Sequence, residues 1–511
     1  MEGSTWSVIK NHRWAILFCA ISSLGSFCYG YDQIYFTGVL GMQPFMDDYG
    51  HRDSATGTSS LSTSFTSLTS SIIYVGELFG ALTAAPINDY YGRKAVFFTA
   101  SISIIGGGIA QVADQGIMGV IVLGRILIGH GIGNFTVTCL LYIGEIAPQQ
   151  IRGPALMSFQ LLQSCSQLVA SGITQGTSTI RSDVSYRIPM GLLILLPTLM
   201  LLGLLIIPES PAWYMSRQRV DEAKAALHTI HRSTPSYDPT ADILALQEAT
   251  RMEMANQQEA SWSSLVKDPV ERRKALYACG SMCAQQINGI VFFYSYGVVF
   301  AQSIGMSDPF TVSLITNVLQ VVSVAVSVVL SKRIPRRANL LTTTTLMFIA
   351  YIVIGGISTH NITNQSATAI VVISYVVIVA FNFGLGPLAY TMASEVAVGC
   401  NRNKIMSCSI VTFFFTTWLV SFTAPYLYYD ANLGPMLAFI YAGTTMFSLA
   451  YIWFCVGETS GRSLAEVSLF FQNRVPVRQW KDYQPPSLTE ETIFQKDTGV
   501  QEGLSERIEF V

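Results

Sequence analysis

The chain has 511 residues, of which 50% are hydrophobic and 12% are charged, and its formal net charge is −2. Soluble domains carry about 25% charged residues, so this composition argues against an ordinary soluble protein and indicates a protein with many membrane spans. A net charge this close to zero gives no electrostatic reason to expect a nucleic acid as partner.

Twelve apolar segments, each long enough to cross a membrane as a helix, follow one another along the chain. We expect the first six at about 14–40, 66–87, 95–113, 117–141, 154–175 and 188–207. The second six are expected at about 275–302, 310–331, 338–357, 367–392, 405–428 and 434–456. These spans predict an all-α polytopic membrane protein with two six-helix halves, 14–207 and 273–456. A tail (1–13) precedes them, a helical linker (208–272) joins them, and a polar tail (457–511) follows.

Two charged turns repeat at corresponding positions of the two halves. Glu145 precedes Arg152 by seven residues after the fourth span, and Glu395 precedes Arg402 by seven residues after the tenth. A repeat of acid, turn and base at the same offset indicates that the second half is a duplicate of the first.

Basic residues gather in alternate connections between the spans, and the positive-inside rule then places both termini and the linker in the cytosol. The sequons that begin at Asn361 and Asn364 would lie outside, where they are candidates for glycosylation. A third sequon, at Asn134, lies within a span and is discounted.

Two acids lie within predicted spans, Asp32 in the first and Glu77 in the second. A carboxylate at membrane depth costs roughly 2.5–3.5 kcal/mol, and burial favours the protonated form of a carboxyl group. We expect Asp32 to bind and release a proton, with a structural acid bonded to neighbouring spans as the alternative. Glu77 is a second candidate for a proton or a solute, although a hydrogen bond between spans is the favoured interpretation.

Amide side chains mark a candidate binding site in each half. Gln160, Gln163 and Gln167 share one face of the fifth span. Neutral amides both donate and accept, which suits the hydroxyl groups of a polyol in a water-filled cavity; hydrogen bonds between helices are the alternative. The candidates in the second half are the amides at a glycine break and further polar or aromatic residues: Gln285, Gln286, Asn288, Asn317, Asn382, Tyr390 and Trp418.

The charged turns on the predicted cytosolic side form a third group. Its members follow spans two, four, eight and ten: Asp89, Arg93, Glu145, Arg152, Arg336, Glu395 and Arg402. We expect charges of the two halves to meet here and to form a gate that closes the inner side, because a network that breaks as a unit can bias two conformations. The alternative is that the bases only orient the chain.

These motifs resemble those of the sugar porter family of the major facilitator superfamily. The resemblance covers nearly all of 14–480 and rests on Gly30-Tyr31-Asp32, Asp89 to Lys94, Gly124-Arg125, Tyr142 to Gly153, Pro208-Glu209-Ser210-Pro211, Gln285-Gln286 and Glu458 to Ser463. It implies a twelve-helix fold with nested repeats, sugar contacts at Gln160, Gln167, Gln285 and Gln286, and proton coupling at Asp32. Gly386 to Tyr390 resembles the fungal maltose/α-glucoside permease branch.

Some positions depart from the family pattern. Val291 stands where the family usually has Asn, and Tyr390 replaces the tryptophan of hexose porters. The solute is therefore left open between a simple sugar, a disaccharide, a polyol, a sugar acid and a fungal metabolite.

The sequence thus predicts a monomeric plasma-membrane carrier whose partners are a sugar-like solute, a proton and the bilayer. We expect no enzyme activity, cofactor or metal, because the six histidines are scattered along the chain. Two other classes remain: a proton-driven exporter of a drug or metabolite, and a nutrient sensor that does not transport. The short tail, 457–511, argues against the sensor.

Overall fold

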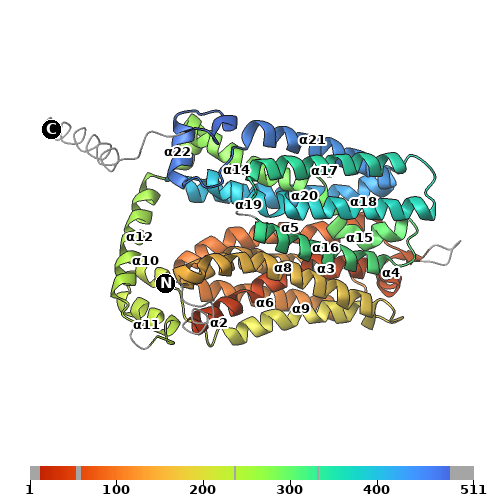
Figure 1. Cartoon of the computed structure of the whole chain (residues 1–511). Coiled ribbons are helices and arrows are strands. Elements are labelled where there is room, and N and C mark those ends of the chain that lie inside the picture. Colours follow the sequence, from red (N-terminus) through yellow and green to blue (C-terminus); the bar gives the residue numbers. More distant parts are fainter. Residues whose placement is uncertain (1–11, 53–58, 235–236, 331–332, 484–511) are drawn as a thin grey trace.

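The computed structural model describes residues 12–52, 59–234, 237–330 and 333–483. Residues 1–11 of the predicted first tail and 484–511 of the last tail lie outside the described residues. Long helices lie side by side along one axis and form two groups that follow the two halves of the sequence (Figure 1). The described strands are a short antiparallel pair, β1 (His51–Arg52) and β2 (Ser59–Ser60).

The first half contains the long helices α2 (Arg13–Ser22) with α3 (Leu24–Leu40), α5 (Thr63–Tyr91), α6 (Arg93–Ala113), α7 (Met118–Ile146), α8 (Gln149–Thr177) and α9 (Val184–Gly203), and the short α4 (Gln43–Tyr49). The second half contains α14 (Pro269–Ile287) with α15 (Ile290–Ser303), α16 (Pro309–Leu330), α17 (Arg336–Ile357), α18 (Asn364–Phe383) with α19 (Leu385–Val396), α20 (Arg402–Pro425) with η1 (Tyr426–Asp430), η2 (Gly434–Met436) and α21 (Leu437–Cys455).

The predicted linker contains four helices: α10 (Pro211–Ser216), α11 (Val220–Ile230), α12 (Thr240–Glu259) and α13 (Trp262–Lys267). The helices α10 to α12 lie at one end of the two groups, and α4 lies at the other (Figure 1). We name these ends the linker face and the α4 face. After α21 the chain forms α22 (Leu464–Gln472) and η3 (Val477–Gln479), also at the linker face.

Ten described helical segments are long and apolar enough to cross a membrane. The fifth and seventh predicted spans are not among them. The fifth, α8, carries the polar glutamine face, and the seventh is split into α14 and α15 at Asn288 and Gly289. Both nevertheless lie among the others (Figure 1), so each of the twelve predicted segments is helical.

The break in the seventh span has a defined geometry. Gly289 has φ +80°, a left-handed conformation that favours glycine. The Asn288 side chain accepts from the Ile290 N–H at 3.1 Å and donates to the carbonyl oxygens of Ala284 and Gln285 at 3.1 and 2.9 Å. The side chain thus satisfies backbone groups that the interrupted helix leaves free.

Glycines bring α5 and α7 into close contact, as small residues do between membrane helices. A Cβ atom on Gly80 would lie 2.1 Å from the carbonyl oxygen of His130, and one on Gly133 would lie 2.1 Å from that of Glu77. Glycines of the fourth span therefore serve helix packing. This contact fixes Glu77 on α5 relative to Arg125 on α7.

Neutral donors join the two halves near the α4 face. The Thr37 hydroxyl donates to the Tyr294 carbonyl at 2.9 Å, and the Gln302 amide donates to the Gly41 carbonyl at 2.8 Å. The Ser67 hydroxyl donates to the Phe422 carbonyl at 2.5 Å, and the Thr63 hydroxyl donates to the Asp430 carboxylate at 2.7 Å. The described ion pairs all lie within one half, within the linker or within the C-terminal segment.

Candidate functional site

A buried ion pair lies in the first half. Oδ1 of Asp32, on α3, accepts from Nη1 of Arg125, on α7, at 2.8 Å, and both side chains are at least 96% buried. Nε of Arg125 also donates to the Thr69 carbonyl at 3.2 Å, and its guanidinium lies 4.2 Å from the ring centre of Phe36. In the sequence, Arg125 stood out only within the family motif Gly124-Arg125. Its pairing could have been anticipated, because a base within an apolar span usually pairs with a buried acid.

Glu77 lies nearby but has no such partner. It is 1% exposed, and within the described chain neither of its carboxylate oxygens has a hydrogen-bond partner. The favoured interpretation of Glu77, that it forms a hydrogen bond between spans, is therefore wrong.

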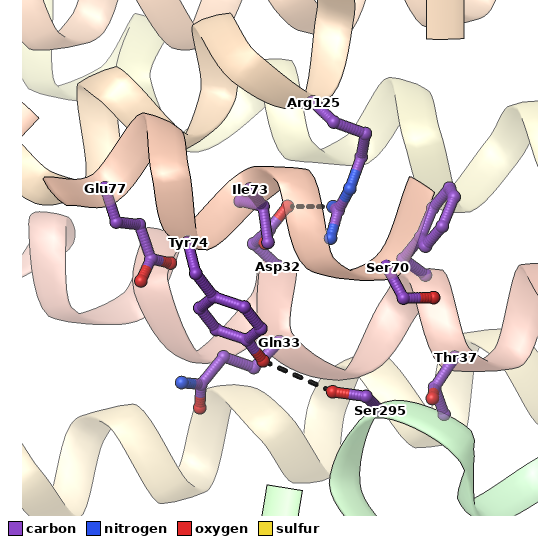
Figure 2. Close-up of a pocket in the computed structure, with 10 residues that line it drawn as sticks. Asp32, Gln33, Thr37, Ser70, Ile73, Tyr74, Glu77, Arg125 and Ser295 are labelled. Carbon is purple, nitrogen blue, oxygen red and sulfur yellow. Dashed lines mark hydrogen bonds and ion pairs between the residues drawn. The ribbon is translucent and has the colours of Figure 1, made fainter. Parts of the chain in front are cut away.

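Asp32, Glu77 and Arg125 line one cavity (Figure 2). The other lining residues come from α3, α5 and α15: Gln33, Phe36, Thr37, Ser70, Ile73, Tyr74 and Ser295. The cavity has room for about one water molecule. The Tyr74 hydroxyl and Ser295 Oγ, which belong to different halves, are 3.2 Å apart, so the cavity reaches the boundary between the halves.

The predicted glutamine face of α8 takes part in a chain of amide hydrogen bonds. Nε2 of Gln167 donates to Oε1 of Gln33 at 2.5 Å, and Nε2 of Gln163 approaches the same oxygen at 3.4 Å. Gln320, on α16 of the second half, donates to Oε1 of Gln167. The chain therefore crosses between the halves through Gln33 and Gln320, which the sequence analysis did not single out. The side chain of Gln160 has no hydrogen bond within the described residues.

The amides of the second half divide between two roles. Nε2 of Gln285 donates to the Gly386 carbonyl at 2.6 Å, while its buried Oε1 has no partner in the described part of the chain. Gln286 is buried beside it. Asn288 bonds to the helix break, as described above, rather than to the amide chain.

The remaining candidates lie farther along the same half. Asn382 donates to the Tyr294 hydroxyl at 2.7 Å, and Asn317 lines a second cavity together with Tyr294. Tyr390 packs against Phe413, with ring centres 5.4 Å apart. Trp418 stacks on Phe422 at 5.6 Å. The structure does not bring Tyr390 or Trp418 into the amide chain.

Two of the predicted gate residues in each half form an ion pair. Arg93 donates to both carboxylate oxygens of Glu145, from Nε at 2.9 Å and from Nη2 at 2.5 Å. Arg336 is ion-paired with Glu395. Each pair lies within one half, and in this conformation the described charges of the two halves do not pair with each other at the linker face.

The acid and the base of each repeated turn do not pair with each other. Arg152 is exposed, and its Nε donates to the Ala147 carbonyl at 3.1 Å rather than to Glu145. Arg402 is exposed and forms no ion pair among the described residues. Asp89 is exposed too, and its backbone carbonyl accepts from Trp213 at 3.0 Å and from Arg217 at 2.7 Å.

Two carboxylates that the sequence did not mark as functional cap the starts of α6 and α17. Glu209 accepts from the backbone N–H groups of Arg93, Lys94 and Ser210 at 3.0, 3.1 and 2.9 Å. In the second half, Glu458 accepts from those of Arg336, Arg337 and Ser460, each at 3.1 Å. A carboxylate at a helix N-terminus is favoured by free N–H groups and by the helix dipole. Both glutamates stand in motifs that carried the family resemblance, but their partners at the starts of α6 and α17 lie more than 100 residues away.

Two further predictions concern glycosylation and metal binding. Asn361 and Asn364 are exposed, and the hydroxyl groups of Thr363 and Ser366 cap the start of α18. Asn134 is fully buried, which confirms that its sequon should be discounted. Among the residues that the structure describes, no three His, Cys, Asp or Glu side chains are arranged to hold a metal ion.

Comparisons with known proteins agree with this geometry. The family model described as "Sugar (and other) transporter" matches residues 18–471. The low-affinity glucose transporter HXT1 of Saccharomyces cerevisiae is 27% identical over 475 residues, which cover 91% of this chain and 82% of that protein. The high glucose sensor RGT2 of the same yeast is 30% identical, over 92% of this chain and 63% of its own length.

A solved structure shows the same fold. The E. coli xylose transporter XylE, solved with 6-bromo-6-deoxy-D-glucose, superposes with a TM-score of 0.72 at 18% identity. The superposition covers 90% of this chain and all of XylE. The arrangement of helices is therefore that of a major facilitator protein, with both halves present.

Proposed function

Because the chain belongs to the sugar (and other) transporter family, we propose that it carries a neutral, sugar-like solute across a membrane by alternating access. The family is one of transporters rather than enzymes. The observation that carries the proposal is the amide chain of Gln33, Gln167 and Gln320, which joins the halves at a point between the two faces.

Sugar hydroxyl groups can replace these amide contacts without a change in charge. Each amide both donates and accepts, as each hydroxyl does. When the halves rock apart, the bond between Gln167 and Gln320 breaks, and a bound solute can then bridge the two side chains. The substrate contacts that we propose are Gln160, Gln167, Gln285 and Gln286, with Asn288, Asn382, Tyr390 and Trp418 in supporting positions.

We assign the linker face to the cytosol, because the basic connections gather there. The inner gate would then consist of Asp89, Arg93, Glu145, Arg152, Arg336, Glu395 and Arg402. In the opposite conformation, their approach across the halves would close this face. Asp32 and Glu77 are the proposed proton-coupling residues. We also propose a monomer in the plasma membrane, with glycosylation at Asn361 and Asn364.

Uptake of labelled D-glucose, D-xylose, maltose and sorbitol by transporter-null yeast, at two external pH values, tests the proposal. Loss of one or two hydrogen bonds, about 0.5–1.5 kcal/mol each, should raise the half-saturation concentration of the carried solute in Gln167→Ala by a factor between roughly 2 and roughly 100. Gln247→Ala, on the exposed face of α12, is the matched control. Unaltered affinity in Gln167→Ala would refute the site, and absence of uptake of every probe would refute the carrier.

A nutrient sensor is the second candidate, favoured by the 30% identity to RGT2. A sensor would bind D-glucose without accumulating it, so binding to the purified protein without uptake would favour this function.

A further inference from the structure

The charges around the central cavity do not balance. Its described lining contains two acids, Asp32 and Glu77, and one base, Arg125. Arg125 bonds to Asp32 and to the Thr69 carbonyl. Figure 2 shows the Glu77 carboxylate on the side of the cavity away from the Arg125 guanidinium, near Tyr74 and Gln33. An ionised Glu77 would therefore be an uncompensated buried charge.

Such a charge is unstable away from water. The effective penalty for burying one ion without a partner is several kcal/mol, and a buried carboxyl group avoids this penalty by taking up a proton. Asp32 does not face the same penalty, because Arg125 lies 2.8 Å away and is itself almost completely buried.

We propose that Glu77 is a proton-binding site separate from the Asp32–Arg125 ion pair, and that it takes up its proton independently of Asp32. The part of this proposal that concerns coupling to solute movement rests on the proposed carrier function. The proton-binding part does not.

Among the residues that the structure describes, Arg125 is the only base in the lining of the cavity that holds Glu77. The titratable groups near it, on the helices that pack around the cavity, are Tyr29 and Asp32 on α3, Tyr74 on α5, Arg125 on α7 and Tyr390 on α19. The nearest histidine along α7, His130, bonds instead to Thr83 and Ser103. Within the described residues, α6 and α20 contribute no charged side chain to the cavity lining.

The position of Glu77 suits a proton that is exchanged with both faces. Glu77 is the middle residue of α5, 14 residues from Thr63 and 14 from Tyr91. This helix packs directly against α20 of the other half. One helical turn away, Tyr74 contacts Ser295 across the boundary. A rocking motion of the halves that breaks this contact would therefore open Glu77 to water, from one face or the other.

Infrared difference spectroscopy of the purified full-length protein in lipid vesicles tests proton binding without any solute. After a step from neutral to alkaline pH, the wild type should lose a carboxylic-acid C=O band. Glu77→Gln should lack this band, whereas Glu77→Asp, Asp32→Asn and the exposed control Glu248→Gln should retain one. A band that persists in Glu77→Gln, or a wild type with no such band, would overturn the proposal.

Uptake of D-glucose into vesicles under a 100 mV potential tests the coupling. One coupled charge supports a ratio of roughly fifty between the D-glucose concentrations inside and outside the vesicles. The Glu77→Gln protein should not build up this ratio. A Glu77→Gln protein that accumulates D-glucose as strongly as the wild type would overturn the coupling role. If the wild type itself carries no D-glucose, the carrier assignment for this sugar fails while the infrared result still decides proton binding.

Discussion

The substitution Glu209→Gln tests whether the carboxylate that caps α6 stabilises the first half. This carboxylate accepts from three backbone N–H groups at 2.9–3.1 Å and is 9% exposed. Glutamine has the same shape, but one oxygen becomes an NH2 group that cannot accept. The change leaves at least one N–H without a partner, about 1–3 kcal/mol, and removes the favourable charge at the helix N-terminus, about 0.3–1 kcal/mol. We expect the free energy of unfolding to fall by roughly 1–4 kcal/mol.

Thermal unfolding of the detergent-solubilised protein is the assay. A unit of roughly 150–250 residues loses about 2–4 °C in Tm for each kcal/mol, so the Tm should fall by at least about 2 °C. Glu458→Gln, which changes the equivalent cap of the second half, should have a similar effect. Glu222→Gln is the control, because this exposed residue pairs only with Arg219 on the surface. An unchanged Tm in Glu209→Gln would refute the reasoning, and an equal fall in the control would attribute the effect to lost charge alone.

Three further predictions concern the helix break and the linker face. Gly289→Ala should destabilise the protein by roughly 1–2 kcal/mol from its left-handed backbone alone, and by more because the new Cβ would lie 2.2 Å from the Tyr441 ring; a wild-type melting curve would contradict this. Burial lowers the pKa of His231 from its ordinary 6.5. The docked linker therefore disfavours the protonated ring, so docking should be stable above pH 6.5 and weaken as the pH falls below 6.5. Protease cleavage of the linker should then rise between pH 7.5 and 5.5, but not in His231→Asn. The backbone N–H of Ser463 lowers the pKa of Glu466 from 4.5, so protease cleavage in 457–483 should rise as pH falls below about 4.5, and should not depend on pH in Glu466→Gln.

Features that depend on one helix could be predicted from the sequence. The twelve helical segments follow from long apolar runs, and the polar face of α8 follows from the spacing of Gln163 and Gln167 on that helix. The partners of these glutamines, Gln33 and Gln320, belong to other helices. Which residues become partners depends on how each helix is rotated in the bundle. The spacing of residues along one helix gives no information about that rotation.

The turn between Glu145 and Arg152 shows the same limit more sharply. Seven residues correspond to two helical turns only if the helix is continuous. Here α7 ends at Ile146 and α8 begins at Gln149, so the chain changes direction between the two charges. Glu145 instead meets Arg93, at the start of α6. The repeated charges predict a duplication, but the partners of these charges could be found only from the fold.

The neutral donors between the halves have a consequence for the response to ionic strength. At 0.15 M salt, charges more than about 8 Å apart in water are screened, and ion pairs that joined the halves would weaken as salt rises. In this structure the described ion pairs stay within each half, while hydroxyl and amide groups join the halves near the α4 face. The balance between the conformations should therefore depend little on the salt concentration at the α4 face.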